Sequence, residues 1–190
     1  MVFSDQVYTL IESAERLKRA ADLCFAKGEY DNAISTYDLT IETLNPLRGS
    51  SIGEFLAIKA LANQASTYLK LEEFEKVVAT CNLALTVPSV SLDVHLKSKL
   101  YHRKSVALGA MKKFEAALQF VDFGISLGET SLVSSFDELR EDLVKSISSK
   151  LIVPILPRPI AFTAVEVGTM ISFFFDNRGD PNVLIPMLEE

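Results

Sequence analysis

The sequence predicts an all-α fold made of stacked helix hairpins, and three observations support this prediction. Residues Leu61–Leu85 place apolar side chains at helical spacing on both sides of a short polar turn at Glu72–Glu73. Two further segments, Ser13–Leu44 and Ser98–Leu127, repeat this pattern. The composition, with 48% hydrophobic and 23% charged residues, is that of a folded chain. Because one hairpin cannot bury its own apolar face, the copies are expected to stack as a solenoid.

The three hairpins carry their apolar residues at matching distances from the turn. In the first, Ala21 and Cys24 lie on one helix face before Gly28 ends the helix, as glycine often does at a helix C-terminus. Ala33 and Tyr37 continue the apolar face on the second helix. The third hairpin carries small and apolar residues at the matching positions, which are Ser105, Leu108, Phe114, Ala117, Val121 and Gly124.

The turn positions Gly28, Glu72 and Lys112 are separated by 44 and 40 residues. These spacings leave room for a connection between one hairpin and the next. The connections Asn45–Gly53 and Thr86–Asp93 contain proline or glycine and are expected to be loops.

One more helix is predicted over Ser135–Leu151. Ser135 is a suitable N-cap, with Glu138 three residues later. Its apolar stripe is formed by Phe136, Leu139, Leu143, Val144 and Ile147. Because a solenoid must cover its last apolar edge, this helix is expected to cap the stack.

Residues 152–190 differ in character. Pro154, Pro157 and Pro159 exclude a helix over Ile152–Ile160 and favour an extended tether. The following Ala164–Phe175 has a helical apolar face, and Asn177–Pro181 reads as a turn. This arrangement resembles the second half of an ankyrin repeat. The alternative is a plain apolar segment that docks on the solenoid.

The repeated hairpin resembles the tetratricopeptide repeat. Small and aromatic residues on the first helix and an aromatic residue and alanine on the second occur three times over residues 13–127, and proline follows the first two hairpins at Pro46 and Pro88. The resemblance implies a right-handed α-solenoid. We expect three repeats in residues 1–131, a capping helix in 132–151, a proline-rich tether in 152–163 and a short helical, ankyrin-like segment in 164–190.

Composition and the absence of known motifs argue against several classes of function. The net charge of −6 and a pI near 5.1 give no general attraction to nucleic acid or anionic lipid. Met1–Leu10 lacks a signal peptide, and no stretch approaches the ~20 apolar residues of a membrane span, so we expect a cytoplasmic protein. Cys24 and Cys81 are expected to be reduced thiols in the core. His95, which is expected to be solvated, and His102 have no metal-binding neighbours in sequence, so no enzyme, cofactor or metal is expected.

The first helices of the hairpins are expected to line a concave groove. Counted from the turn, the residues that face away from the core carry five cations and two carboxylates, or +3 on a chain of −6. These residues are Glu15, Lys18, Arg19, Asp22, Lys59, Ala62, Asn63, Ser66, Lys99, His102, Arg103 and Val106.

Four of them resemble the two-carboxylate clamp of co-chaperone tetratricopeptide domains, most closely the immunophilin and protein-phosphatase branch. Lys18, Asn63, Lys99 and Arg103, called the clamp residues below, match four of its five positions. The resemblance implies binding of the acidic C-terminal peptide of a heat-shock chaperone, ending Glu-Glu-Val-Asp. Phe25 is placed to offer an apolar wall to that peptide, and Lys59 adds charge to the same groove.

The fifth position departs from the family, because Asp22 replaces its asparagine. An ionised Asp22 would repel the carboxylate that the clamp holds. Three interpretations stay open: a peptide-binding adaptor, a scaffold without clamp function, and an N-terminal fragment of a larger protein. Charged residues on such a face are also often merely solvated.

Overall fold

The computed structural model describes residues 2–87 and 93–151, and these residues form α-helices and short 3₁₀ helices without a strand. The elements are α1 (Val2–Ala26), α2 (Tyr30–Thr43), η1 (Asn45–Leu47), α3 (Ser51–Lys70), α4 (Phe74–Thr86), α5 (Val94–Ala110), α6 (Phe114–Ser126), η3 (Thr130–Leu132) and α7 (Val133–Leu151). The all-α prediction is confirmed. The proline-rich tether and the ankyrin-like segment lie outside the described residues.

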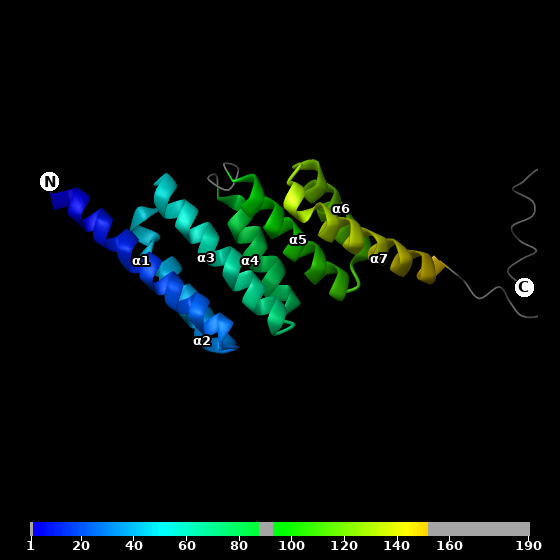
Figure 1. Ribbon diagram of the computed structural model, residues 1–190, viewed down its shortest axis with the longest axis horizontal. Coiled ribbons are helices and arrows are strands. Elements are labelled where there is room, and N and C mark those ends of the chain that lie inside the picture. The colour runs from blue at the N-terminus through cyan, green and yellow to red at the C-terminus, as the bar shows by residue number, and fades with distance from the viewer. Residues whose placement is uncertain (1, 88–92, 152–190) are drawn as a thin grey trace, which may run out of the picture. The chain divides into compact units, whose positions relative to one another are not determined.

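The helices α1 to α7 follow one another as stacked hairpins (Figure 1). Each helix contacts the next in the chain, and α1 also contacts α3, α3 contacts α5, and α5 contacts α7. The odd-numbered helices therefore form one layer, and α2, α4 and α6 form the other. This arrangement brings side chains of α1, α3 and α5 together although they are far apart in sequence.

The three hairpin turns have the same backbone geometry. Gly28, Glu72 and Lys112 have φ of 81°, 59° and 60°, in the left-handed region. In each turn the N–H of the next residue donates to a carbonyl five residues earlier, as Glu29 does to Cys24 at 2.9 Å. Glycine adopts this conformation without strain, whereas glutamate and lysine adopt it at a cost. The common turn confirms the phase that the sequence predicts.

Each second helix buries residues at the same three distances from its turn. The first two are Ala33 and Tyr37 in α2, Val77 and Cys81 in α4, and Ala117 and Val121 in α6; the third is Thr40, Ala84 and Gly124. Small side chains at these positions let neighbouring helices approach closely. Burial raises the pKa of the Cys81 thiol to about 12, so this cysteine is a protonated core residue.

Three helices begin earlier than the sequence indicates. α1 begins at Val2 rather than near Ser13, and α7 begins at Val133, which puts Ser135 inside the helix instead of at its N-cap. α3 begins at Ser51, so Gly53 lies in its first turn and not in a loop. A Cβ at Gly53 would lie 2.6 Å from the Cβ of Leu47, so glycine there reflects a close approach of η1.

α7 packs on α6 through its first apolar residues. Phe136 is 1% exposed and Leu143 is buried, whereas Val144, expected in the same stripe, is 47% exposed. The Phe136 ring occupies the space where a Cβ at Gly124 would be, and it also contacts the His102 ring edge-on at 5.3 Å between centroids. His95, expected in a connection, lies in the first turn of α5, with Nδ1 3.5 Å from a Glu129 carboxylate oxygen.

The contact between Gly124 and Phe136 gives the first prediction. Gly124→Ala should lower the free energy of unfolding by about 1–3 kcal/mol, because the added methyl group overlaps a buried ring. Urea denaturation measures the change.

Gly109→Ala is the matched control. A Cβ there would meet only the flexible end of Leu143, at 3.1 Å, and alanine is the better helix former. Gly109→Ala should therefore be neutral or stabilising. Equal destabilisation by both substitutions would contradict the assignment of Phe136 as the obstacle.

Candidate functional site

The sequence-predicted site residues come from three helices of one layer. Lys18, Asp22 and Phe25 lie on α1, Lys59 and Asn63 on α3, and Lys99 and Arg103 on α5. The pairs Lys18–Asp22, Lys59–Asn63 and Lys99–Arg103 are each four residues apart. Side chains at this spacing lie on the same side of a helix.

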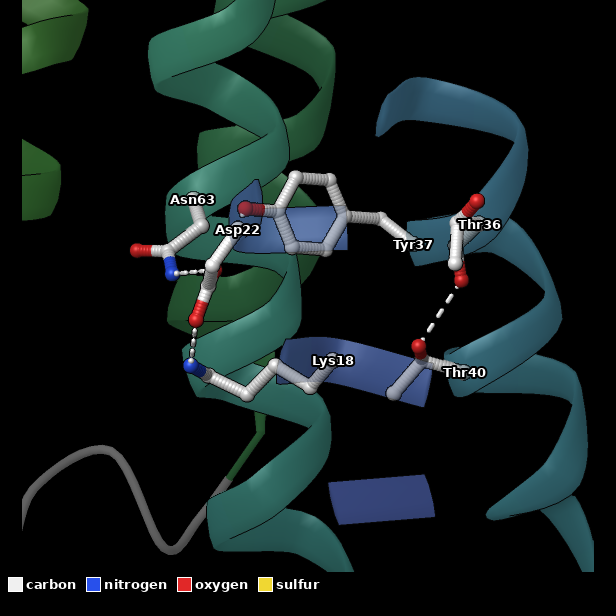
Figure 2. A network of polar contacts seen from close by, with 6 residues as sticks. All are labelled: Lys18, Asp22, Thr36, Tyr37, Thr40 and Asn63. Carbon is white, nitrogen blue, oxygen red and sulfur yellow. Dashed lines mark hydrogen bonds and ion pairs between the residues drawn. The ribbon is translucent and has the colours of Figure 1, made fainter. Parts of the chain in front are cut away.

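Asp22 accepts hydrogen bonds from three helices. Its Oδ1 accepts from the Tyr37 hydroxyl at 2.6 Å and from the Asn63 side-chain amide at 2.8 Å. Its Oδ2 accepts from the Lys18 ammonium at 2.7 Å. Figure 2 shows Lys18, Tyr37 and Asn63 all directed at this carboxylate. Asp22 therefore links α1 to α2 and α3.

The network keeps Asp22 ionised. Partial burial raises the pKa of Asp22. The hydrogen bonds from Lys18, Tyr37 and Asn63 together lower the pKa by more than burial raises it, so it lies below the ordinary value of 3.8. Tyr37 is 1% exposed, and its burial together with its hydrogen bond to Asp22 raises the pKa of its hydroxyl. The hydroxyl is therefore a constant donor at neutral pH.

Sequence reasoning missed the role of Tyr37. The residue reads as apolar because it is at the core position that Cys81 and Val121 occupy in the other hairpins. A signal was present, since a tyrosine hydroxyl in a buried position requires a hydrogen-bond partner.

Arg103 brings α5 to the same place. Its Nη1 donates to the carbonyl oxygen of Ala62, next to Asn63, at 2.7 Å. Burial lowers the pKa of Arg103, but a guanidinium stays charged throughout the physiological range. Lys99 lies one turn earlier on α5 and is half-buried. Side-chain contacts thus join Lys18, Asp22 and Asn63, and Arg103 is attached to the main chain of Ala62, the residue before Asn63.

The two other predicted residues, Lys59 and Phe25, contact aromatic rings. The Lys59 ammonium is 4.1 Å from the centroid of the Phe55 ring. Phe25 packs against Tyr30, with 5.7 Å between ring centroids. A hollow of about 760 Å³ adjoins Lys59 and is lined by Glu15, Ser51, Ile52, Phe55, Leu56, Lys59, Asp93 and Val94.

Two expected groove residues are elsewhere. Ala62 is 1% exposed and belongs to the core, so only its carbonyl serves the site. His102 is covered by Phe136 of α7, and burial lowers the pKa of its imidazole. Both side chains therefore face the packed side of their helices, although their distance from the hairpin turn predicts that they face the groove.

Within residues 2–87 and 93–151, none of the helices has the length and apolar character needed to cross a membrane. The same part of the chain holds no group of three or more His, Cys, Asp or Glu side chains arranged to bind a metal ion.

Solved structures and curated proteins resemble the chain, although no protein-family model matches it. The first tetratricopeptide domain of Spaghetti (RPAP3), bound to the HSP90 peptide SRMEEVD, is 25% identical with a TM-score of 0.57, covering 72% of this chain and 94% of that one. The TPR2B domain of yeast Sti1, in complex with pHsp70, is 23% identical with a TM-score of 0.55, covering 72% and 98%. The chain therefore has the tetratricopeptide-repeat fold.

A curated relative is the ER protein translocation subcomplex subunit sec67 of Schizosaccharomyces pombe. It is 29% identical over 123 residues, which is 63% of this chain. The match spans 61% of the length of that relative.

The hydrogen bond from Tyr37 gives the second prediction. Tyr37→Phe should lower the free energy of unfolding by about 1–3 kcal/mol at neutral pH, because it removes a donor to an ionised carboxylate. The pKa of Asp22 is depressed, so its stabilising contribution is present above pH 3.8 and is lost as the pH falls through the folded-state pKa. The difference between the two proteins should therefore shrink below pH 3.8.

Urea denaturation in steps between about pH 7 and pH 2.5 measures this difference. Tyr30→Phe is the control, because the Tyr30 hydroxyl has no hydrogen bond within the described part of the chain. A difference between wild type and Tyr37→Phe that is independent of pH would contradict the role of Asp22.

Proposed function

We propose that this chain is a non-catalytic adaptor that captures the acidic C-terminal peptide of a heat-shock chaperone between α1, α3 and α5. The observation that supports it best is the gathering of donors from three helices. Lys18 and Asn63 meet at Asp22, and Arg103 is anchored beside Asn63 through the carbonyl of Ala62.

These donors suit a carboxylate. Lysine and arginine supply charge-assisted hydrogen bonds, and asparagine adds a neutral N–H donor. Lys99 and Arg103 are one turn apart, so both can reach one carboxylate at the end of a peptide. A peptide end is also the part of a chain that always carries an ionised main-chain carboxylate near neutral pH.

The comparisons support the same ligand class. The Spaghetti (RPAP3) domain holds a peptide that ends Glu-Glu-Val-Asp, and its sequence identity to this chain is 25%. That peptide is therefore the first ligand to test.

The third prediction concerns this peptide. Fluorescence polarisation should detect binding of labelled SRMEEVD, and Lys99→Ala or Arg103→Ala should weaken it by about tenfold or more through loss of a charge-assisted hydrogen bond. Lys97→Ala on the same helix is the matched control, because residues two apart lie on different sides of α5.

Lys97→Ala should leave the affinity unchanged. Absence of binding at ~100 µM protein, or binding that ignores both the Lys99 and the Arg103 substitutions, would reject the peptide-binding site. The scaffold without clamp function would then be the better interpretation.

The sec67 relative favours a second, compatible function. The 29% identity over 63% of this chain suggests a subunit that brings chaperone-bound chains to the translocation machinery of the endoplasmic reticulum. Affinity purification of the tagged chain from detergent-solubilised microsomes should then recover translocation subunits together with it.

Lys99→Ala is the informative variant in this experiment. It should keep the translocation subunits and lose the chaperone, because the clamp residues are proposed to serve the chaperone alone. Recovery of the chain without any translocation subunit would reject the second function.

A further inference from the structure

The two donors that the proposed function assigns to a ligand on the α1–α3 side are already engaged. Asp22 Oδ2 accepts from the Lys18 ammonium at 2.7 Å, and Oδ1 accepts from the Asn63 amide at 2.8 Å. The carboxylate of Asp22 thus makes the contacts that a ligand carboxylate would make with these residues. It belongs to the chain itself, so no peptide has to be present for these donors to be satisfied.

Asp22 is held in this position from behind. Tyr37 is 1% exposed, and its hydroxyl donates to Asp22 Oδ1 at 2.6 Å. If the carboxylate swung away to admit a ligand, the buried hydroxyl would lose its acceptor. The carboxylate is therefore a fixed part of the site.

Among the clamp residues, the positive charge that remains uncompensated is on α5. Lys18 and Asp22 form an ion pair and compensate each other. Within residues 2–87 and 93–151, Lys99 and Arg103 form no ion pair with a carboxylate, so they are the uncompensated cations among the clamp residues. They lie one turn apart on one helix and offer one carboxylate-binding position.

We propose that Asp22 is an internal substitute for a ligand carboxylate, so that the site selects a C-terminal peptide whose last side chain is uncharged. This inference rests on the proposed function. The main-chain carboxylate of such a peptide binds Lys99 and Arg103, and its last side chain faces Asp22 without repulsion. A final aspartate brings a second carboxylate towards Asp22 and its engaged donors, and the like charges disfavour binding.

The selectivity of Asp22 can be separated from its structural role. Asparagine at this position keeps an oxygen that accepts from Tyr37 but carries no charge, so Asp22→Asn removes the repulsion and releases the Lys18 ammonium. A cooperative thermal melting transition of Asp22→Asn is the check that the variant folds.

The test uses two peptides, SRMEEVD and SRMEEVN, which differ only in the charge of the last side chain. Wild type should bind SRMEEVN at least about threefold more tightly than SRMEEVD, because the last carboxylate of SRMEEVD faces Asp22 and has no free donor. Asp22→Asn should bind SRMEEVD at least about tenfold more tightly than wild type does, with a change below about threefold for SRMEEVN.

A double-mutant cycle of Lys18 and Asp22 measures whether the ion pair with Asp22 keeps Lys18 from the ligand. Lys18→Ala should weaken SRMEEVD binding at least about threefold more in the Asp22→Asn background than in wild type, because the ammonium is free to meet the ligand only in that background. A purely structural Asp22 would not create this coupling. Lys99→Ala should weaken both backgrounds and serves as the control.

The outcomes separate the two hypotheses. A wild-type affinity for SRMEEVD that equals or exceeds the affinity for SRMEEVN overturns the role of Asp22 and leaves the proposed function intact. Failure of both peptides to bind wild type and Asp22→Asn rejects the proposed function together with this inference. If Asp22→Asn does not fold, the preference of wild type between the two peptides decides the question.

Discussion

The hydrogen-bonded carboxylate of Asp22 is the contact on which the first half of the solenoid depends. It accepts from α1, α2 and α3 at distances of 2.6–2.8 Å, so one side chain sets the relative position of three helices. A carboxylate that is partly removed from water needs such donors, since hydrogen bonds must offset the loss of hydration. The first hairpin is thereby joined to the second through polar contacts as well as through apolar packing.

The other end of the solenoid depends on shape. Gly124 of α6 leaves room for the Phe136 ring of α7, and that ring also covers His102 of α5. Equivalent positions in the first two hairpins carry Thr40 and Ala84, which are also buried. The third hairpin receives a larger aromatic side chain and therefore has no side chain of its own at this point. The same buried position on each second helix is thus kept throughout the solenoid, but at the last hairpin it accommodates the Phe136 ring of α7.

The sequence predicted the helix hairpins and their turns because both follow from local periodicity. Gly28, Glu72 and Lys112 have the same left-handed conformation, as their common phase implies. The start of α3 was missed, because the close approach of Leu47 to Gly53 is a tertiary contact that no local pattern contains. Tyr37 was missed for a related reason: its ring follows the apolar pattern, while its hydroxyl has its partner on another helix.

The site shows the same limit in its charges. Counting residues assigns Lys18 to ligand binding, whereas the structure pairs it with Asp22 at 2.7 Å. A lysine in an ion pair with a fixed carboxylate has less to offer a second anion, because the new contact must replace part of one already made. Arg103 differs, since its hydrogen bond is with a neutral carbonyl, and within residues 2–87 and 93–151 no ion pair with a carboxylate compensates its charge. Two cations of equal formal charge therefore have unequal value for a ligand, and this inequality concentrates the attraction for an anion on α5.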